Sequence, residues 1–157
     1  MLKSLQAAPR TALVPLRVII GIGFLAHGVA KLSRGPEKFG ALLHYLGIPF
    51  PVATAWLTTA TETLGGLALI IGAFVAIAAL PLIATMVVAM LTIHIHNGFS
   101  AVNTVGLTAS GPQFGPPGYE INLLYIAGLI ALALSGPTRM SVDALRKADR
   151  DRERSRP

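Results

Sequence analysis

The sequence predicts an all-α integral membrane protein built as a bundle of four transmembrane helices. Three long runs contain no Asp, Glu, Lys or Arg: Val18–Ala30, Thr63–Gly118 and Ile121–Thr138. Charged residues make up 13% of the chain and apolar residues 53%, whereas a soluble domain carries about 25% charged residues. Because about 20 mostly apolar residues cross the hydrocarbon of a bilayer, these runs provide enough apolar chain for several spans.

The first expected span covers residues 12–32 and carries charge and glycine on one stripe. Pro15 falls in its first turn, where a missing N–H group is tolerated. At about 100° per residue, Arg17, Gly21 and Lys31 lie close to one line along the helix. Charges avoid lipid and small residues let backbones approach, so we expect this stripe to face other helices.

The chain before this span resembles a signal peptide, because Lys3 and Arg10 precede an apolar run. Arg17 interrupts the approach to that run, and no cleavage site is followed by a soluble domain. We therefore expect a retained first span.

The second and third spans are expected at residues 52–72 and 74–94, joined by a tight connection at Gly72. Residues 33–51 connect the first span to the second, and the second half of this connection, residues 44–51, suits an interfacial turn with aromatic anchors. The second span carries a polar, small stripe that includes Glu62. Pro81 is expected to kink the third span because it removes a helical hydrogen bond.

A long uncharged loop is expected at residues 99–118, followed by a fourth span at residues 119–135. The loop is rich in Gly and Pro, and its lack of charge suggests a flap against the bundle or the bilayer surface. Glu120 lies in the first turn of the fourth span, and Gly136-Pro137 ends that span. Ser141 can cap a short helix beyond it.

The spans divide the chain into a transmembrane domain, residues 1–138, and a basic tail, residues 139–157, which we expect to be partly helical or disordered. An even number of spans places both ends on one side of the membrane. The basic residues at the two ends outnumber the cluster of Lys31, Arg34 and Lys38 between the first two spans, which opposes this orientation. The positive-inside rule then predicts an inner (plasma) membrane protein with both termini cytoplasmic.

The formal net charge of +6 does not indicate nucleic-acid binding, because the basic tail shows no basic–aromatic pattern. Attraction to an anionic lipid leaflet accounts for it. The chain has no Cys, which excludes disulfides, thiolate nucleophiles and iron–sulfur ligation. Sequence motifs for a serine hydrolase or a phosphate loop are also absent. Redox chemistry would therefore require a bound cofactor or a partner protein.

Arg17 and Glu62 are the two charges expected deepest in the bundle. Isolated burial of either would cost several kcal/mol, and an arginine side chain can span their expected axial offset. We therefore predict an Arg17–Glu62 pair. Such a pair can be purely structural or can take part in function.

A polar pocket is expected in the outer half of the bundle, roofed by the 99–118 loop. Six residues come from three helix ends at similar depth: His27, Lys31, His94, His96, Asn97 and Glu120. Of these and the buried pair, Glu62, Glu120 and His27 are the candidates for catalytic proton transfer. No metal site is predicted, since His94 and His96 point about 200° apart on a helix. Haem ligation by His27 and one of them stays an alternative.

The same residues, in this order and spacing, resemble the DoxX family of small four-helix bacterial membrane proteins. The resemblance rests on Arg17-x3-Gly21-x2-Phe24-Leu25-x-His27-Gly28-x2-Lys31-Leu32, Leu46-Gly47-x-Pro49, Glu62-x2-Gly65-Gly66-Leu67-x-Leu69, Asn97-Gly98-Phe99, Gly118-Tyr119-Glu120 and Gly136-Pro137-x4-Ser141-x-Asp143. Related proteins resemble the small membrane subunit of a thiosulfate:quinone oxidoreductase or associate with oxidative-stress complexes. More distant relatives act in the assembly or trafficking of membrane proteins.

Two functional hypotheses follow. The first is a redox-associated, quinone-linked subunit that binds a lipophilic molecule within the bundle and is at most the membrane subunit of an oxidoreductase. A protein partner would supply electrons or the soluble catalytic subunit. The second is a non-catalytic assembly or chaperone-like scaffold for a partner enzyme. A transporter is a third option, which would require a homo-oligomer to form a pathway.

Overall fold

The computed structural model describes residues 10–138 and 140–154, most of which are helical. The helices are η1 (Arg10–Leu13), α2 (Val14–Arg34), α3 (Pro36–Tyr45), α4 (Pro51–Ile71), α5 (Val75–Thr92), η2 (His94–Asn97), α6 (Glu120–Ser135) and α7 (Val142–Arg154). Two short strands, β1 (Thr104–Thr108) and β2 (Gly111–Phe114), pair as an antiparallel hairpin. The expected N-terminal charge at Lys3 and the last residues of the basic tail lie outside the described residues.

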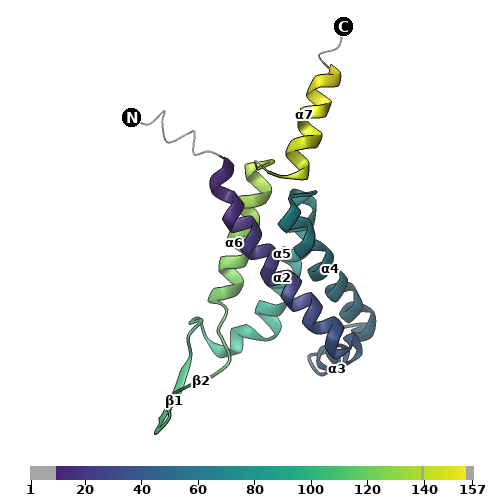
Figure 1. Cartoon of the computed structure of the whole chain (residues 1–157). Helices are drawn as coiled ribbons and strands as arrows, with labels where there is room; N and C mark the ends of the chain where they lie inside the picture. Colours follow the sequence, from purple (N-terminus) through teal and green to yellow (C-terminus); the bar gives the residue numbers. More distant parts are fainter. Residues whose placement is uncertain (1–9, 139, 155–157) are drawn as a thin grey trace.

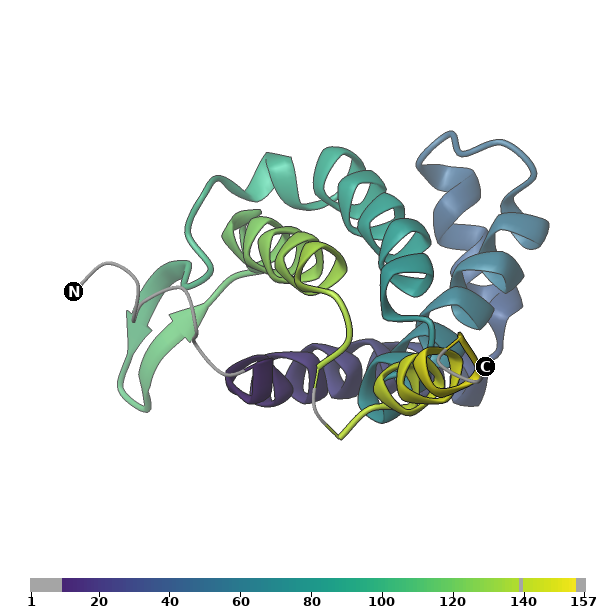
Figure 2. The same ribbon diagram turned by 90° about the horizontal axis from the view of Figure 1, so that it is seen from above.

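Four helices, α2, α4, α5 and α6, surround a common centre (Figures 1 and 2). α2 packs against α4 and α6, and α5 packs against the same two helices from the other side. The core between them consists of buried apolar side chains: Ile20, Phe24, Leu69, Ala79, Leu82, Leu129 and Leu132. Phe24 also meets Tyr125 of α6 edge to face, with ring centroids 5.3 Å apart.

The helix group has two distinct ends (Figure 1). The start of α2, the end of α6 and all of α7 lie at one, which we call the α7 end. The other carries α3 and the β1–β2 hairpin, and we call it the hairpin end. α7 extends away from the helix group (Figure 1). Ser141 caps this helix as predicted, because the Ala144 N–H donates to Ser141 Oγ at 3.1 Å.

The seam between α2 and α4 depends on glycine, as the charge–glycine stripe of the first span predicts. Gly21, Gly28 and Gly66 are all buried there. A Cβ atom added to Gly21 would lie 2.8 Å from the carbonyl oxygen of Gly66, so the backbones approach too closely for a larger residue. This antiparallel contact fixes the register and places Arg17 beside the end of α4.

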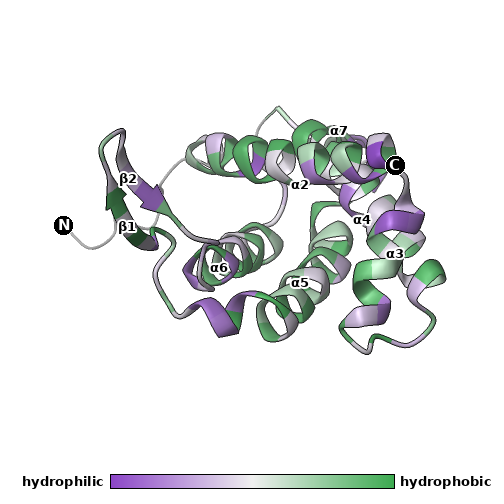
Figure 3. Cartoon of the chain, turned by 90° about the horizontal axis from the view of Figure 1, so that it is seen from below, coloured by the Kyte–Doolittle hydropathy of each residue, from purple (hydrophilic) through white to green (hydrophobic). Residues whose placement is uncertain are grey.

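The four helices closely follow the residue ranges expected for the spans. In the described part of the chain, two stretches are long and apolar enough to cross a bilayer, Thr11–Arg34 and Val75–Thr92, and α6 is a shorter apolar helix. Figure 3 shows hydrophobic colour along most of α5 and α6, whereas η2 is hydrophilic. The described chain is thus mostly helical, but it contains six α-helices and a small sheet rather than four helices alone.

The expected connection at residues 33–51 contains a helix that was not predicted, α3, whereas most of the turn expected at residues 44–51 follows the end of α3 at Tyr45. Gly35, with φ of 88°, ends α2, and Pro36 starts α3 at a position where its missing N–H is tolerated. α3 packs on α4 with Pro36, Gly40 and Leu43 buried. This short helix depends on tertiary contact, which a local reading of its Pro and Gly boundaries does not show.

Most of the segment at residues 99–118 does not lie against the bundle, which was one of its two expected positions, and the other, at the bilayer surface, stays a prediction. The middle of this segment forms the β1–β2 hairpin, which projects away from the helices (Figure 1). Gly111, with φ of 120°, makes the tight turn, and Leu107 near the tip is 83% exposed. Backbone hydrogen bonds such as Gly118 N–H to Ser100 C=O close only the base of this hairpin, so its tip is free of the helix group.

Candidate functional site

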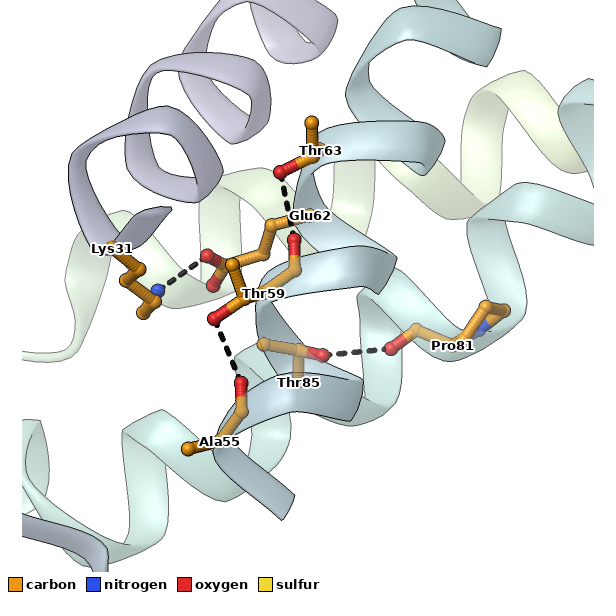
Figure 4. A network of polar contacts seen from close by, with 7 residues as sticks. All are labelled: Lys31, Ala55, Thr59, Glu62, Thr63, Pro81 and Thr85. Atoms are coloured by element: carbon orange, nitrogen blue, oxygen red, sulfur yellow. Dashed lines mark hydrogen bonds and ion pairs between the residues drawn. The ribbon is translucent and has the colours of Figure 1, made fainter. Parts of the chain in front are cut away.

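A buried ion pair joins α2 to α4 in the hairpin half of the helix group. Lys31 Nζ donates to Glu62 Oε2, and the two side chains point toward one another in Figure 4. The Glu62 side chain is only 4% exposed and that of Lys31 is 20% exposed. Lys31 Nζ also lies 4.8 Å from the centroid of the Phe39 ring, a cation–π contact supplied by α3.

The predicted Arg17–Glu62 pair is therefore wrong, although both residues are buried. Arg17 lies beside the end of α4 and donates to the carbonyl oxygen of Ile70 at 3.3 Å. Glu62 is about two turns away from Ile70, or about 12 Å along the axis of α4. The glycine contacts of the seam set the register of α2 against α4. The depth estimate from the sequence did not include these contacts, and it placed Arg17 and Glu62 too close together along the axis.

A cleft of about 740 Å³ opens beside the Lys31–Glu62 pair. Its apolar lining is Phe24, Phe39, Leu43, Ile48, Leu57, Pro81, Ala84, Met86, Val88, Ala89, Ile93, Pro117 and Ile121. Its polar lining is His27, Lys31, Thr54, Thr58, Thr61, Glu62, Thr85, Thr92, His94, Asn122 and Tyr125. The cleft thus lies among α2, α4, α5 and α6, with α3 closing part of its wall, and combines a mainly apolar surface with a few polar groups, as small-molecule sites do.

Hydrogen bonds fix the roles of several polar groups on the cleft wall. The Thr85 and Thr92 hydroxyls donate to the carbonyls of Pro81 and Val88, at 3.0 and 2.7 Å, so their oxygens can still accept a bond from a ligand. His94 Nδ1 lies 3.1 Å from the carbonyl oxygen of Pro117. A carbonyl only accepts, so His94 Nδ1 carries a proton, and in the neutral imidazole Nε2 is then an acceptor.

The structure brings three of the six predicted pocket residues to this cleft: His27, Lys31 and His94. The other three are not among its lining residues. Glu120 Oε2 accepts from the Ala101 N–H at 2.8 Å, and Asn97 Nδ2 donates to the Pro117 carbonyl at 3.2 Å. These bonds hold the base of the hairpin. His96 is exposed on η2.

Sequence reasoning did not assign Asn122 or Tyr125 of α6 to the cleft. Asn122 is 3% exposed, and its Nδ2 donates to the Met86 carbonyl at 3.4 Å. Its Oδ1 atom has no hydrogen-bond partner among the described residues. An amide inside an otherwise apolar span is the signal that points to this position, because such side chains bond across helices.

A second polar cluster lies at the α7 end and surrounds Arg17, which is 2% exposed. The Arg17 guanidinium donates to Thr138 Oγ1 at 2.6 Å and to the carbonyls of Ile70 and Met140 at 3.3 and 3.1 Å. These acceptors come from α4 and from the segment that leads into α7. Arg17 therefore joins α2 to the segment that leads into α7.

Asp143 completes this cluster from α7. Its Oδ1 and Oδ2 atoms accept from the backbone N–H groups of Phe74 and Val75, at 2.8 and 3.0 Å, and so cap the N-terminus of α5. The Asp143 N–H in turn donates to the Gly72 carbonyl at 3.0 Å. The Ser141-x-Asp143 motif thus caps two helices, its Ser starting α7 and its Asp starting α5.

Comparison with known proteins places this chain in a family. The DoxX family model matches residues 12–95. The chain belongs to the DoxX family. It is also 28% identical over 147 residues to Rv3486, an uncharacterized membrane protein of Mycobacterium tuberculosis, in an alignment that covers 88% of this chain and 83% of the relative. No solved structure matches the chain significantly.

This DoxX protein is accordingly a membrane protein, associated with the lipid bilayer. The segment that matches the family model contains α2 to α5 and therefore both members of the Lys31–Glu62 pair. The α6 wall of the cleft, with Asn122 and Tyr125, follows the matched segment in the chain.

Proposed function

We propose that α2, α4, α5 and α6 cross the inner membrane as a four-helix bundle with the α7 end in the cytoplasm. α4 has 21 residues, enough to span about 30 Å of hydrocarbon at about 1.5 Å per residue. The start of α2 and the end of α6 lie at the same end of the helix group (Figure 1), which an even number of spans requires. The basic residues of α7 favour the cytoplasmic side for that end.

The cleft of this bundle binds a lipophilic small molecule of the quinone type, and the protein acts as a redox-associated membrane subunit. One observation carries this proposal: a cleft of about 740 Å³ with a mainly apolar lining borders the buried Lys31–Glu62 pair. Ionisable groups at membrane depth are expensive and usually serve function. A ring with polar oxygens and an apolar tail matches both parts of this lining.

The polar groups provide complementary contacts for such a molecule. Lys31 has further N–H donors beyond the one directed at Glu62, and these can bond to a carbonyl oxygen of the ring. His94 Nε2 can accept from a hydroxyl of the reduced form. Glu62 and His27 line the cleft and are the groups able to carry a proton, whereas Glu120 holds the hairpin base. Electrons must come from a partner protein or a bound cofactor, because the chain has no Cys.

Filling the cleft tests this proposal. Ala89 lines the cleft on α5, whereas Ala76 on the same helix is exposed and does not line it. Protein in a mild detergent is titrated with decylubiquinone, and binding is measured as the rise in thermal unfolding temperature. The wild type and Ala76→Phe should both be stabilised, and Ala89→Phe should not. Equal responses of the two variants would exclude the cleft as the binding site.

The alternative role is a scaffold that assembles a partner enzyme. Two extensions favour it: α7 and the β1–β2 hairpin both project from the helix group (Figure 1). The hairpin carries exposed apolar residues such as Leu107 and Phe114. Isolation of an intact partner enzyme whose turnover is unaffected by Glu62→Gln and Lys31→Met would support the scaffold and would contradict the quinone-linked role.

A further inference from the structure

The cleft carries no net charge. Among its described lining residues, Lys31 and Glu62 are the only Lys, Arg, Asp or Glu, and they are paired with one another. The positive charge that would attract an acidic head group is therefore already balanced by Glu62.

This balance opposes an anionic ligand. A carboxylate, sulfonate or phosphodiester head in the cleft would add an uncompensated negative charge beside the carboxylate of Glu62, in a setting of low polarity. An uncharged head loses less hydration and finds both donors and acceptors on the cleft wall. The membrane around the protein offers both kinds of molecule, so the cleft has to distinguish between them.

We infer that Glu62 is a specificity-determining residue that keeps the cleft neutral and selects uncharged lipophilic molecules over anionic lipids. The inference rests on the proposed function, because it assumes that the cleft is a lipid-like binding site. It adds the substrate class and the residue that sets it. Lys31 holds its position through Phe39 as well as through Glu62, so loss of the carboxylate leaves a cation beside the cleft.

Two probes with the same chain and different heads test the inference: hexadecanol, which is neutral, and hexadecanesulfonate, which is permanently ionised. Each is incubated with the purified protein in a mild detergent at pH 8, and the amount retained is measured by mass spectrometry after gel filtration. The wild type should retain hexadecanol in preference to the sulfonate. Glu62→Gln should shift the ratio toward the sulfonate by about tenfold or more, about 1.4 kcal/mol of selectivity.

Two control variants separate this charge effect from other causes. Glu37→Gln removes an exposed carboxylate of α3 that does not line the cleft, and it should keep the wild-type ratio. The double variant Lys31→Met/Glu62→Gln removes both charges and should lose the gain in sulfonate binding. A gain that persists in the double variant would show that the Lys31 cation is not responsible and would overturn the inference.

The wild-type measurement decides the matter even where Glu62→Gln does not fold. A wild type that retains the sulfonate as well as hexadecanol, or that retains neither, overturns the inference. Failure of the proposed quinone ligand gives a different result. A wild type that retains hexadecanol but does not respond to decylubiquinone contradicts the quinone assignment, while the selection of uncharged molecules by Glu62 stands.

Discussion

Two cations on the same stripe of α2 have opposite surroundings. Arg17 lies at the α7 end and donates to three oxygens of the protein, from Thr138, Ile70 and Met140. Lys31 lies three to four turns further on, bonds to Glu62 and borders a cleft of about 740 Å³. The chain itself thus surrounds the first cation, although its Nε has no partner among the described residues, whereas the second borders a space that can hold a bound molecule.

The residue types fit this difference. Arginine has five N–H donors in a planar fork and suits a site where several fixed oxygens converge. Lysine is a compact charge on a flexible stem, and it can bond to Glu62 and to a ligand at the same time. From this comparison we expect changes at the α7 end to lower stability and changes at the cleft to alter binding.

The largest effect on stability is expected from Arg17→Met. The substitution leaves the three oxygens that Arg17 contacts without their donor, and it removes the positive charge near Asp143. Because loss of one partner from a buried polar network is expensive, we expect the free energy of unfolding to fall by about 3–5 kcal/mol. Titration with a denaturing detergent, followed by circular dichroism, measures this change.

Arg17→Lys is the matched variant for this site, since it keeps the charge and removes the fork. It should be intermediate in stability between the wild type and Arg17→Met. If Arg17→Met were as stable as the wild type, the cluster at the α7 end would not be the structural lock that its contacts indicate.

The seam that separates the two cations is expected to be nearly as sensitive. A Cβ atom at Gly66 would lie 2.5 Å from the backbone nitrogen of Leu25, so Gly66→Ala forces α2 and α4 apart. We expect a loss of about 3 kcal/mol of unfolding free energy, measured by the same titration. The control is a glycine whose replacement by alanine causes no clash. Gly47 has open space around it, but its φ of 73° would strain an alanine, so Gly106→Ala in the hairpin is the better control.

Gly106→Ala should change stability by no more than about 0.5 kcal/mol, because a Cβ atom there meets only Gln113 Oε1 at 3.6 Å. The separation of α2 and α4 should also alter the cleft. Loss of decylubiquinone binding in Gly66→Ala, without loss of the folded state, would show that the seam positions Lys31 against Glu62.

A smaller and more local effect is expected from Asp143→Ala. This change removes the cap of α5 and exposes the N–H groups of Phe74 and Val75, at a cost of about 1–2 kcal/mol. Hydrogen exchange should accelerate at the start of α5 while the hairpin end keeps its protection. Faster exchange around Glu62 as well would mean that the two ends of the helix group are not independent.

The four helices of the group could be predicted from the sequence because their signal is local. Long uncharged runs mark the chain, and Pro15, Gly72 and Gly136 stand near the boundaries. α3 and the β1–β2 hairpin could not be predicted in this way. α3 is stabilised by its packing on α4, and the hairpin depends on pairing such as Thr104 with Phe114 across a glycine turn.

The partners of the buried charges depend on register, which the sequence alone does not determine. The depth estimate placed Glu62 within reach of Arg17, whereas the register of α2 against α4 places it beside Lys31. His27, Lys31 and His94 line the cleft because each lies on a helix near the hairpin end, and their role in binding stays a prediction. Glu120 does not line the cleft, since its carboxylate turns back to the Ala101 N–H.

Apart from the Gly106→Ala control, the smallest effect on stability is expected where both charges beside the cleft are replaced together, in Lys31→Met/Glu62→Leu. Desolvation of two charges offsets much of their attraction, so an apolar pair of similar size should change the unfolding free energy by no more than about 1 kcal/mol. The single variant Lys31→Met leaves Glu62 buried without its partner and should cost more. The same detergent titration measures all three proteins.

Binding should separate this double variant from the wild type even though stability does not. The variant keeps the folded cleft but has neither the ammonium donors nor the carboxylate, so the decylubiquinone response should fall by at least tenfold, about 1.4 kcal/mol. Arg17→Lys, if folded, should keep that response, because its contacts lie at the α7 end. A double variant that binds decylubiquinone normally but unfolds easily would reverse the comparison, and Lys31–Glu62 would then be a second structural lock.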